Sequence, residues 1–167
     1  MKILIFVLTI LVLALIQVTV LPHLSIYQGI PNLILLGSII LIFLEAEDWA
    51  YVFAAIGGIT LDILSSNIFG IFTFGFLAIT WGLIFLNRRI IESTNLLLIL
   101  FLTLISSLVF DFWFLTISRL AGKIPTILIF SRIVGIDALF NVFVMLLIFP
   151  FIFGFWKNYY HRSEIKL

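Results

Sequence analysis

The chain has no cysteine and very few charged residues. Of its 167 residues, 10% are charged and 64% are hydrophobic. The lack of cysteine excludes disulfides, thiolate metal sites and cysteine nucleophiles. The two histidines, His23 and His161, lie near opposite ends of the chain, which is not the spacing of a metal-ligand pair. Because soluble domains carry about 25% charged residues, this composition predicts an integral membrane protein with little mass outside the bilayer.

Sequence signatures of the common enzyme classes are also missing. The chain contains no Gly-x-Ser-x-Gly, no His-Glu-x-x-His, no glycine-rich phosphate loop and no Cys-x-x-Cys. The formal net charge is +1 and no basic patch is present, which argues against nucleic acid as a partner. We therefore expect no catalytic residue, no bound metal and no cofactor.

Long apolar runs predict an all-α integral membrane protein, a compact single-domain bundle of about six transmembrane helices. A span needs roughly 17–25 mostly apolar residues. The expected spans cover residues 3–21, 31–44, 49–65, 70–86, 96–118 and 132–155. The second is the shortest, and Pro31 suits its first turn because a missing N–H costs nothing there. Residues 119–131 form the longest expected loop.

The distribution of cations predicts that both termini are cytoplasmic. An even number of spans places the two termini on the same side, and cytoplasmic loops carry an excess of Lys and Arg. With the N-terminus inside, the outer cations are Arg119, Lys123 and Arg132. The inner cations are then Lys2, Arg88, Arg89, Lys157, Arg162 and Lys166. This excess favours a multi-pass protein of the bacterial cytoplasmic (inner) membrane, surrounded by lipid, with both termini inside.

Two rows of small residues flank the polar turn between the third and fourth expected helices. Before the turn, Ala54, Gly58 and Asp62 recur every fourth residue and share one helix face. The next helix opens on Gly70, and one of its faces carries Gly75, Ala78 and Gly82. Small residues let helix backbones approach each other in lipid. The pattern predicts a closely packed antiparallel pair, although glycines are also common in membrane helices without such a role.

Ionisable side chains within the expected spans form a second group of candidate residues. Asp62, Asp111 and Asp137 lie in the outer halves of their helices, at the level of Arg119 and Arg132. Thr103, Ser107 and Asp111 share a helix face, as do Asp137 and Asn141. Because lipid offers polar groups no partner, these faces are expected to point at one another. They predict either an outer polar pocket or docking site, or a structural network of acids paired with arginines.

Two stretches resemble the rod-shape-determining membrane protein MreD family. The first is Gln17-x-Thr19-x-Leu21-Pro22-x-Leu24-x-Ile26-x-x-Gly29-x-Pro31-x-Leu33, and the second is Gly58-x-x-x-Asp62-x-x-Ser65-x-x-x-x-Gly70. Asn141 is similar to a polar position in the last helix of that family. The family often has Pro-Asp-Leu where this chain has Pro31-Asn32-Leu33. Chain length, span count and short loops are also similar to those of the family.

The resemblance implies a non-catalytic scaffold of the bacterial cell-elongation complex, which controls cell shape and peptidoglycan synthesis. The implied direct partner is MreC. Through MreC the scaffold is linked to MreB, RodA and a class B penicillin-binding protein. The residues expected to pack helices or to contact such a partner are Gln17, Thr19, Pro22, Pro31, Gly58, Asp62, Gly70, Gly75, Gly82 and Asn141.

A second interpretation comes from another class of protein. The MreD family is distantly similar in fold to the substrate-binding S components of energy-coupling-factor vitamin transporters, which have six helices and an outward-facing pocket. S components tend to carry small residues at spacing four in the first helix. Here the first expected span offers Ala14 and the polar pair Gln17 and Thr19, which favours the scaffold over the transporter subunit.

Overall fold

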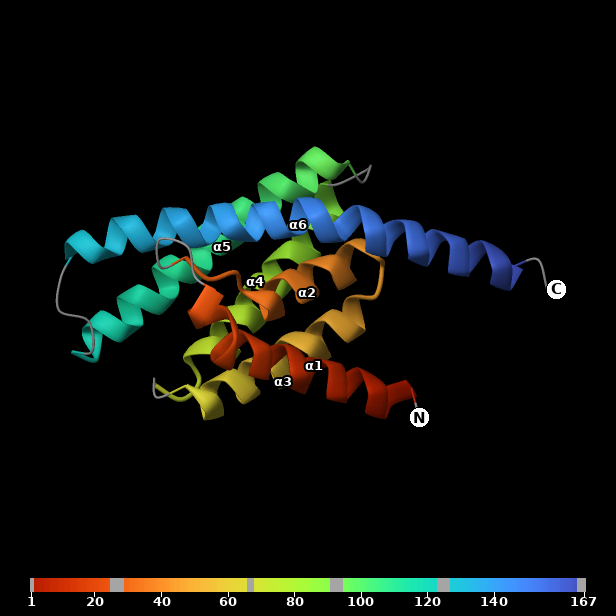
Figure 1. The fold of residues 1–167 in the computed structure, drawn as a ribbon. Coiled ribbons are helices and arrows are strands. Elements are labelled where there is room, and N and C mark those ends of the chain that lie inside the picture. The colour runs from red at the N-terminus through yellow and green to blue at the C-terminus, as the bar shows by residue number, and fades with distance from the viewer. Residues whose placement is uncertain (1, 25–28, 66–67, 91–94, 123–126, 165–167) are drawn as a thin grey trace.

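The described part of the chain folds into a bundle of α-helices. The computed structural model describes residues 2–24, 29–65, 68–90, 95–122 and 127–164 (Figure 1). The α-helices are α1 (Lys2–Thr19), α2 (Leu33–Phe43), α3 (Glu47–Leu64), α4 (Ile71–Ile90), α5 (Leu96–Leu120) and α6 (Ile127–Glu164). A short 3-10 helix, η1 (Leu21–Leu24), follows α1. The all-helical architecture expected from the apolar runs is therefore confirmed.

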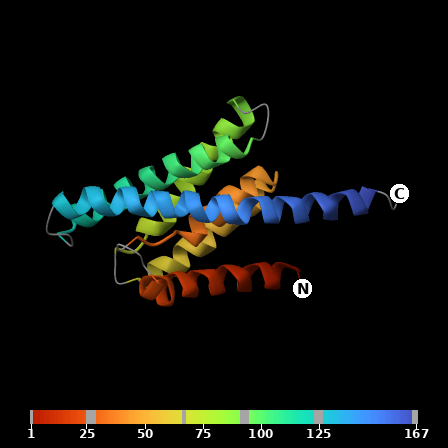
Figure 2. The same ribbon diagram turned by 45° about the horizontal axis from the view of Figure 1, so that its top comes forward.

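The shortest helix, α2, lies at the centre of the bundle. It contacts each of the other five α-helices, and most of its side chains are buried. Helix α1 and the α4–α5 pair lie on opposite sides of it (Figure 2). Because α2 is apolar all round, its sequence favours complete burial rather than one buried face. The remaining helices are thus arranged around a buried central helix.

Within the described ranges, four helices, rather than six, are long and apolar enough to cross a membrane on their own. These candidate spans are Ile3–His23, Ile71–Arg89, Leu96–Leu120 and Gly135–Phe155. Helix α2 has 11 residues, which gives about 16 Å of length against a hydrocarbon core of about 30 Å. Helix α3 has 18 residues and carries Glu47, Asp48 and Asp62. The chain is a helical membrane protein in which α2 is buried among the other helices, whereas α3 keeps an exposed apolar face that includes Val52, Ile59 and Ile63.

Several helices extend further than the apolar runs predicted. Helix α4 continues through Asn87, Arg88 and Arg89, and α6 occupies 38 residues with Pro150 inside it. At the other extreme, α2 begins at Leu33 after its N-cap Asn32, so Pro31 precedes the helix instead of lying in its first turn. The end of an apolar run marks where a helix leaves the hydrocarbon, but the polar residues that follow it can continue the same helix. The expected span limits were therefore wrong at these ends.

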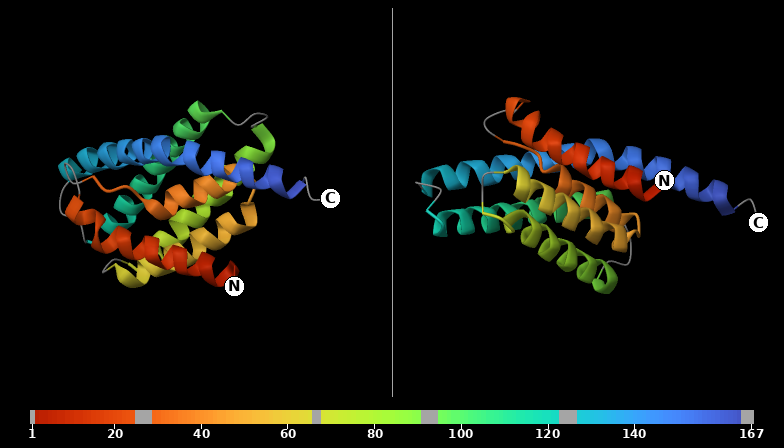
Figure 3. Two further views of the ribbon diagram at one scale, coloured as in Figure 1. Left: turned by 45° about the vertical axis from the view of Figure 1, so that its right-hand side comes forward. Right: turned by 90° about the horizontal axis from the view of Figure 1, so that it is seen from below.

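The two ends of the chain lie at the same end of the bundle (Figure 3). The turn from α2 to α3 and the end of α4 are found there as well, and Arg88 forms an ion pair with Glu47 across them. The Arg88 Nε lies 2.7 Å from a Glu47 side-chain oxygen. At the opposite end, α5 and α6 reach beyond the other helices (Figures 1 and 3).

Candidate functional site

Polar side chains form hydrogen bonds to the first turns of α2 and α4, which begin in the half of the bundle away from the chain termini (Figure 1). The first N–H groups of a helix have no partner within that helix. In lipid such groups need acceptors supplied by the protein itself. We call the two sets of contacts the α2 junction and the α4 junction.

The α4 junction consists of Asp62 on α3 and the first turn of α4. One Asp62 oxygen accepts the Phe72 N–H at 3.0 Å, and the other accepts the Thr73 N–H at 3.1 Å. The Thr73 hydroxyl donates to the second oxygen as well. Asp62 is 4% exposed. A carboxyl group suits this position, because a helix N-terminus carries partial positive charge.

Two glycines allow α3 and α4 to meet at this junction. Gly70 precedes α4 with φ of +96°, a conformation that side chains other than glycine rarely adopt. A Cβ added at Gly58 would lie 2.6 Å from the Thr73 Cα, so the two backbones are in close contact there. Gly58 therefore allows α3 to come close to Thr73. Thr73 is the residue that donates to Asp62, which lies one helical turn after Gly58 on α3.

The α2 junction begins with an amide pair from the first two helices. The Asn32 side-chain oxygen accepts the Leu35 N–H at 3.1 Å, which caps α2. The same oxygen accepts from the Gln17 amide at 3.2 Å, and the Gln17 oxygen accepts the Ile34 N–H at 3.3 Å. Gln17 on α1 and Asn32 together satisfy donors in the first turn of α2.

The last helix completes the α2 junction. Asp137 accepts the Ile30 N–H and Asn141 accepts the Asn32 N–H, each at 2.6 Å. The Asn141 amide then donates to the Ser107 hydroxyl on α5 at 2.9 Å. Asn141 is 1% exposed. The α2 junction thus joins four helices, and it confirms that the polar faces carrying Ser107 and Asn141 meet.

The small residues on α4 do not face α3, which corrects the expectation of two matching glycine faces. A Cβ at Gly75 would lie 3.0 Å from the side chains of Phe110 and Trp113, so Gly75 packs against α5. A Cβ at Gly82 would meet nothing within 4 Å. The contact to Gly58 comes instead from Thr73, which is two residues from Gly75 and therefore points in a different direction.

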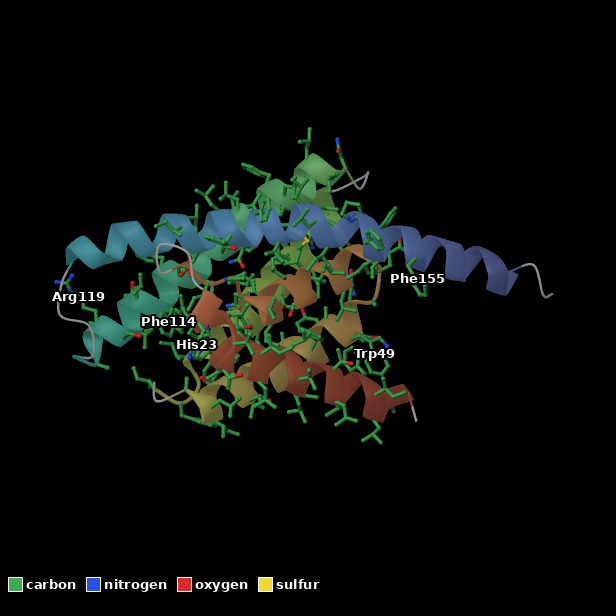
Figure 4. All side chains as sticks on the ribbon, in the orientation of Figure 1. His23, Trp49, Phe114, Arg119 and Phe155 are labelled. Atoms are coloured by element: carbon green, nitrogen blue, oxygen red, sulfur yellow. The ribbon has the colours of Figure 1, made fainter. Side chains whose placement is uncertain are left out.

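The expected pairing of buried acids with arginines is not found among the described residues. Asp62 binds α4 and Asp137 binds the Ile30 N–H. One Asp111 side-chain oxygen is buried and has no hydrogen-bond partner among the described residues. Arg119 is exposed at the far end of α5 (Figure 4). The side chain of Arg132 lies outside the described part of the structure.

The remaining predicted residues lie at the edges of these junctions. The Thr19 hydroxyl donates to the Leu15 carbonyl of its own helix at 2.6 Å. Pro22 lies in η1 and Pro31 directly precedes the Asn32 cap. Asn32 and Thr73 were missed by the sequence reasoning. An Asn directly before an apolar run is an N-cap signal that would have indicated Asn32. No comparable signal indicates Thr73.

These contacts fix helix ends and helix register. Among the described residues, no group of three or more His, Cys, Asp or Glu could hold a metal ion. Comparisons of the chain with protein-family models, with curated proteins and with solved structures returned no match.

Proposed function

We propose that this protein is a non-catalytic membrane scaffold of the MreD type, which binds the transmembrane helix of an MreC-like partner. Through that partner it would act with MreB, RodA and a class B penicillin-binding protein in cell elongation. The proposal rests on the resemblance of residues 17–33 and 58–70 to that family. One structural observation supports it most: the first stretch supplies Gln17 and Asn32 to the α2 junction, and the second supplies Asp62 to the α4 junction.

The position of the proposed scaffold in the membrane follows from charge. We place it in the bacterial cytoplasmic membrane with both termini inside and with all six α-helices within the bilayer. Support comes from the shared end of the two termini, where Arg88 also lies (Figure 3), and from the excess of cations expected inside. Helix α2 need not meet lipid along its whole length, because it contacts all five of the other α-helices.

The structure narrows the choice of the surface that would bind the partner helix. Gly58 and Gly75 contact α4 and α5 within the chain, and Gln17 and Asn141 take part in the α2 junction. Gly82 alone of the proposed packing glycines opens onto free space within the described part. Hydrophobic burial does not drive helix association in lipid, so close packing at a glycine would supply much of the binding. We therefore assign partner binding to the side of α4 at Gly82.

Co-purification with the partner tests this proposal. Gly82→Leu adds bulk where the chain itself has room, so the variant should fold normally but lose most of a co-expressed MreC-like partner. Gly154→Leu is the matched control, because Gly154 on α6 also faces open space, and it should retain the partner. Equal retention of the partner by both variants would contradict the assignment of partner binding to the Gly82 side of α4. Purified protein with a stoichiometric vitamin-like ligand and no affinity for MreC would instead indicate an S component.

A further inference from the structure

The exposed side of α4 carries two aromatic rings and an arginine in a continuous row, which we call the α4 ladder. It consists of Trp81, Phe85 and Arg89, each one helical turn after the last. The rings of Trp81 and Phe85 stack with centroids 6.0 Å apart and planes at 23°. The Arg89 guanidinium lies 5.1 Å from the Phe85 ring centroid. Trp81 is 64% exposed and Phe85 is 46% exposed, so both rings face outward.

Arg88 and Arg89 differ in what surrounds their charge. Arg88 is paired with Glu47. Arg89 is exposed, and its guanidinium lies against the Phe85 ring with no ion pair to a carboxylate among the described residues. The apolar span of α4 ends at Arg89. The Arg89 charge, which has no carboxylate partner in the described part of the chain, therefore lies where the hydrocarbon of a bilayer gives way to lipid headgroups.

We propose that the α4 ladder binds one anionic phospholipid, whose phosphate is held by Arg89 and whose glycerol and upper acyl chain lie against Phe85 and Trp81. A guanidinium presents a planar set of donors that matches a phosphate. Trp81 lies two helical turns, about 12 Å, before Arg89 along α4, so its ring is at the depth of an acyl chain when the phosphate is at Arg89. The contact with Phe85 holds the guanidinium beside the apolar surface, so that headgroup and chain can be bound together.

The negative charge of the phosphate favours a lipid over a partner helix at this surface. An apolar transmembrane helix would cover Arg89 without offering it an anion, which is costly in the membrane. The ladder borders the surface assigned to the partner. Adjacent residues on a helix are about 100° apart, so Trp81 points well away from Gly82, whereas Arg89 lies within about 20° of Gly82 around α4 and two turns closer to the headgroups. The lipid site depends on Arg89, Phe85 and Trp81, and none of its contacts requires the proposed scaffold function.

Native mass spectrometry of the purified full chain tests the lipid site. The probes are phosphatidylglycerol and phosphatidylcholine with identical acyl chains. The wild type should retain phosphatidylglycerol in preference to phosphatidylcholine. Arg89→Gln should reduce bound phosphatidylglycerol about fivefold, since one cation near an anionic lipid contributes about 1 kcal/mol. Arg88→Gln removes the same charge from a residue already paired with Glu47, and it should cause a much smaller loss.

One further variant and one competition experiment distinguish a bound lipid from other ligands of the α4 ladder. Phe85→Leu should weaken phosphatidylglycerol retention without abolishing it, since the charge remains but its aromatic support is lost. Soluble glycerol phosphate, which has no acyl chains, should not displace the lipid at equal concentration. Equal binding of the two lipids by the wild type, or equal loss in the Arg88 and Arg89 variants, would overturn the proposal.

Discussion

The α2 junction and the α4 junction satisfy the same need by different means. At α4, one carboxyl group from the preceding helix accepts both backbone N–H groups, across a separation of 10 and 11 residues. At α2, amide and carboxyl groups from α1 and α6 join the helix's own cap, and the contacts to α6 span 107 and 109 residues. The first junction ties one helix to its neighbour in sequence, and the second ties together the two ends of the fold.

This difference indicates how the bundle is held together. Asp62 closes a short loop, so its contacts fix the α3–α4 pair and leave the other helices unconstrained. Asn141 and Asp137 bind a segment that does not form a regular helix, residues 30–32, inside the bundle. Such a segment is tolerated at membrane depth only where protein surrounds it. The α2 junction is therefore expected to control the packing of the central helix against α1, α5 and α6.

Removing the acceptor at the α4 junction should have the largest effect on stability. Asp62→Ala leaves the Phe72 and Thr73 N–H groups and the Thr73 hydroxyl without their acceptor. Each unsatisfied buried donor costs about 1–3 kcal/mol, so we expect a loss of about 3 kcal/mol or more. Unfolding by SDS in detergent micelles would measure it. Asp62→Asn should lose about half as much, because the amide keeps one acceptor oxygen. An unchanged stability of the Ala variant would show that Asp62 does not support α4.

Truncation in the α2 junction should have a smaller effect. Asn141→Ala leaves the Asn32 N–H without its acceptor and the Ser107 hydroxyl without a donor. Interhelical hydrogen bonds in membranes average about 0.6 kcal/mol and reach about 1.7 kcal/mol, so a loss of about 1–2 kcal/mol is expected in the same unfolding measurement. Ser107→Ala, which removes one bond of this set, should lose less. A larger loss from Ser107→Ala than from Asn141→Ala would contradict the proposed arrangement.

Local patterns in the sequence predicted part of this architecture. The spacing of Gly58 and Asp62 placed both on one face of α3. The meeting of Ser107 and Asn141 followed from their shared need for a polar neighbour. These predictions succeeded because each depends on helical spacing or on the absence of other partners in lipid.

Other features depend on packing that a single sequence does not encode locally. Helix α2 is apolar all round, so its residues do not indicate which helices surround it. Gly57 and Gly58 look alike in the sequence, yet they are about 100° apart on α3. A Cβ on Gly57 would meet Ile34 of α2, whereas one on Gly58 would meet Thr73 of α4. The pairing of Gln17 with Asn32 likewise requires the tertiary fold.

Hydrogen exchange at single backbone amides tests most directly whether the two junctions are separate. We expect Asp62→Ala to increase exchange at Phe72 and Thr73 while Ile30 and Asn32 stay protected. Asn141→Ala should increase exchange at Asn32 and leave the start of α4 protected. If each substitution instead increased exchange equally at both helix starts, the two junctions would form one cooperative unit, and the distinction between a local and a long-range junction would be wrong.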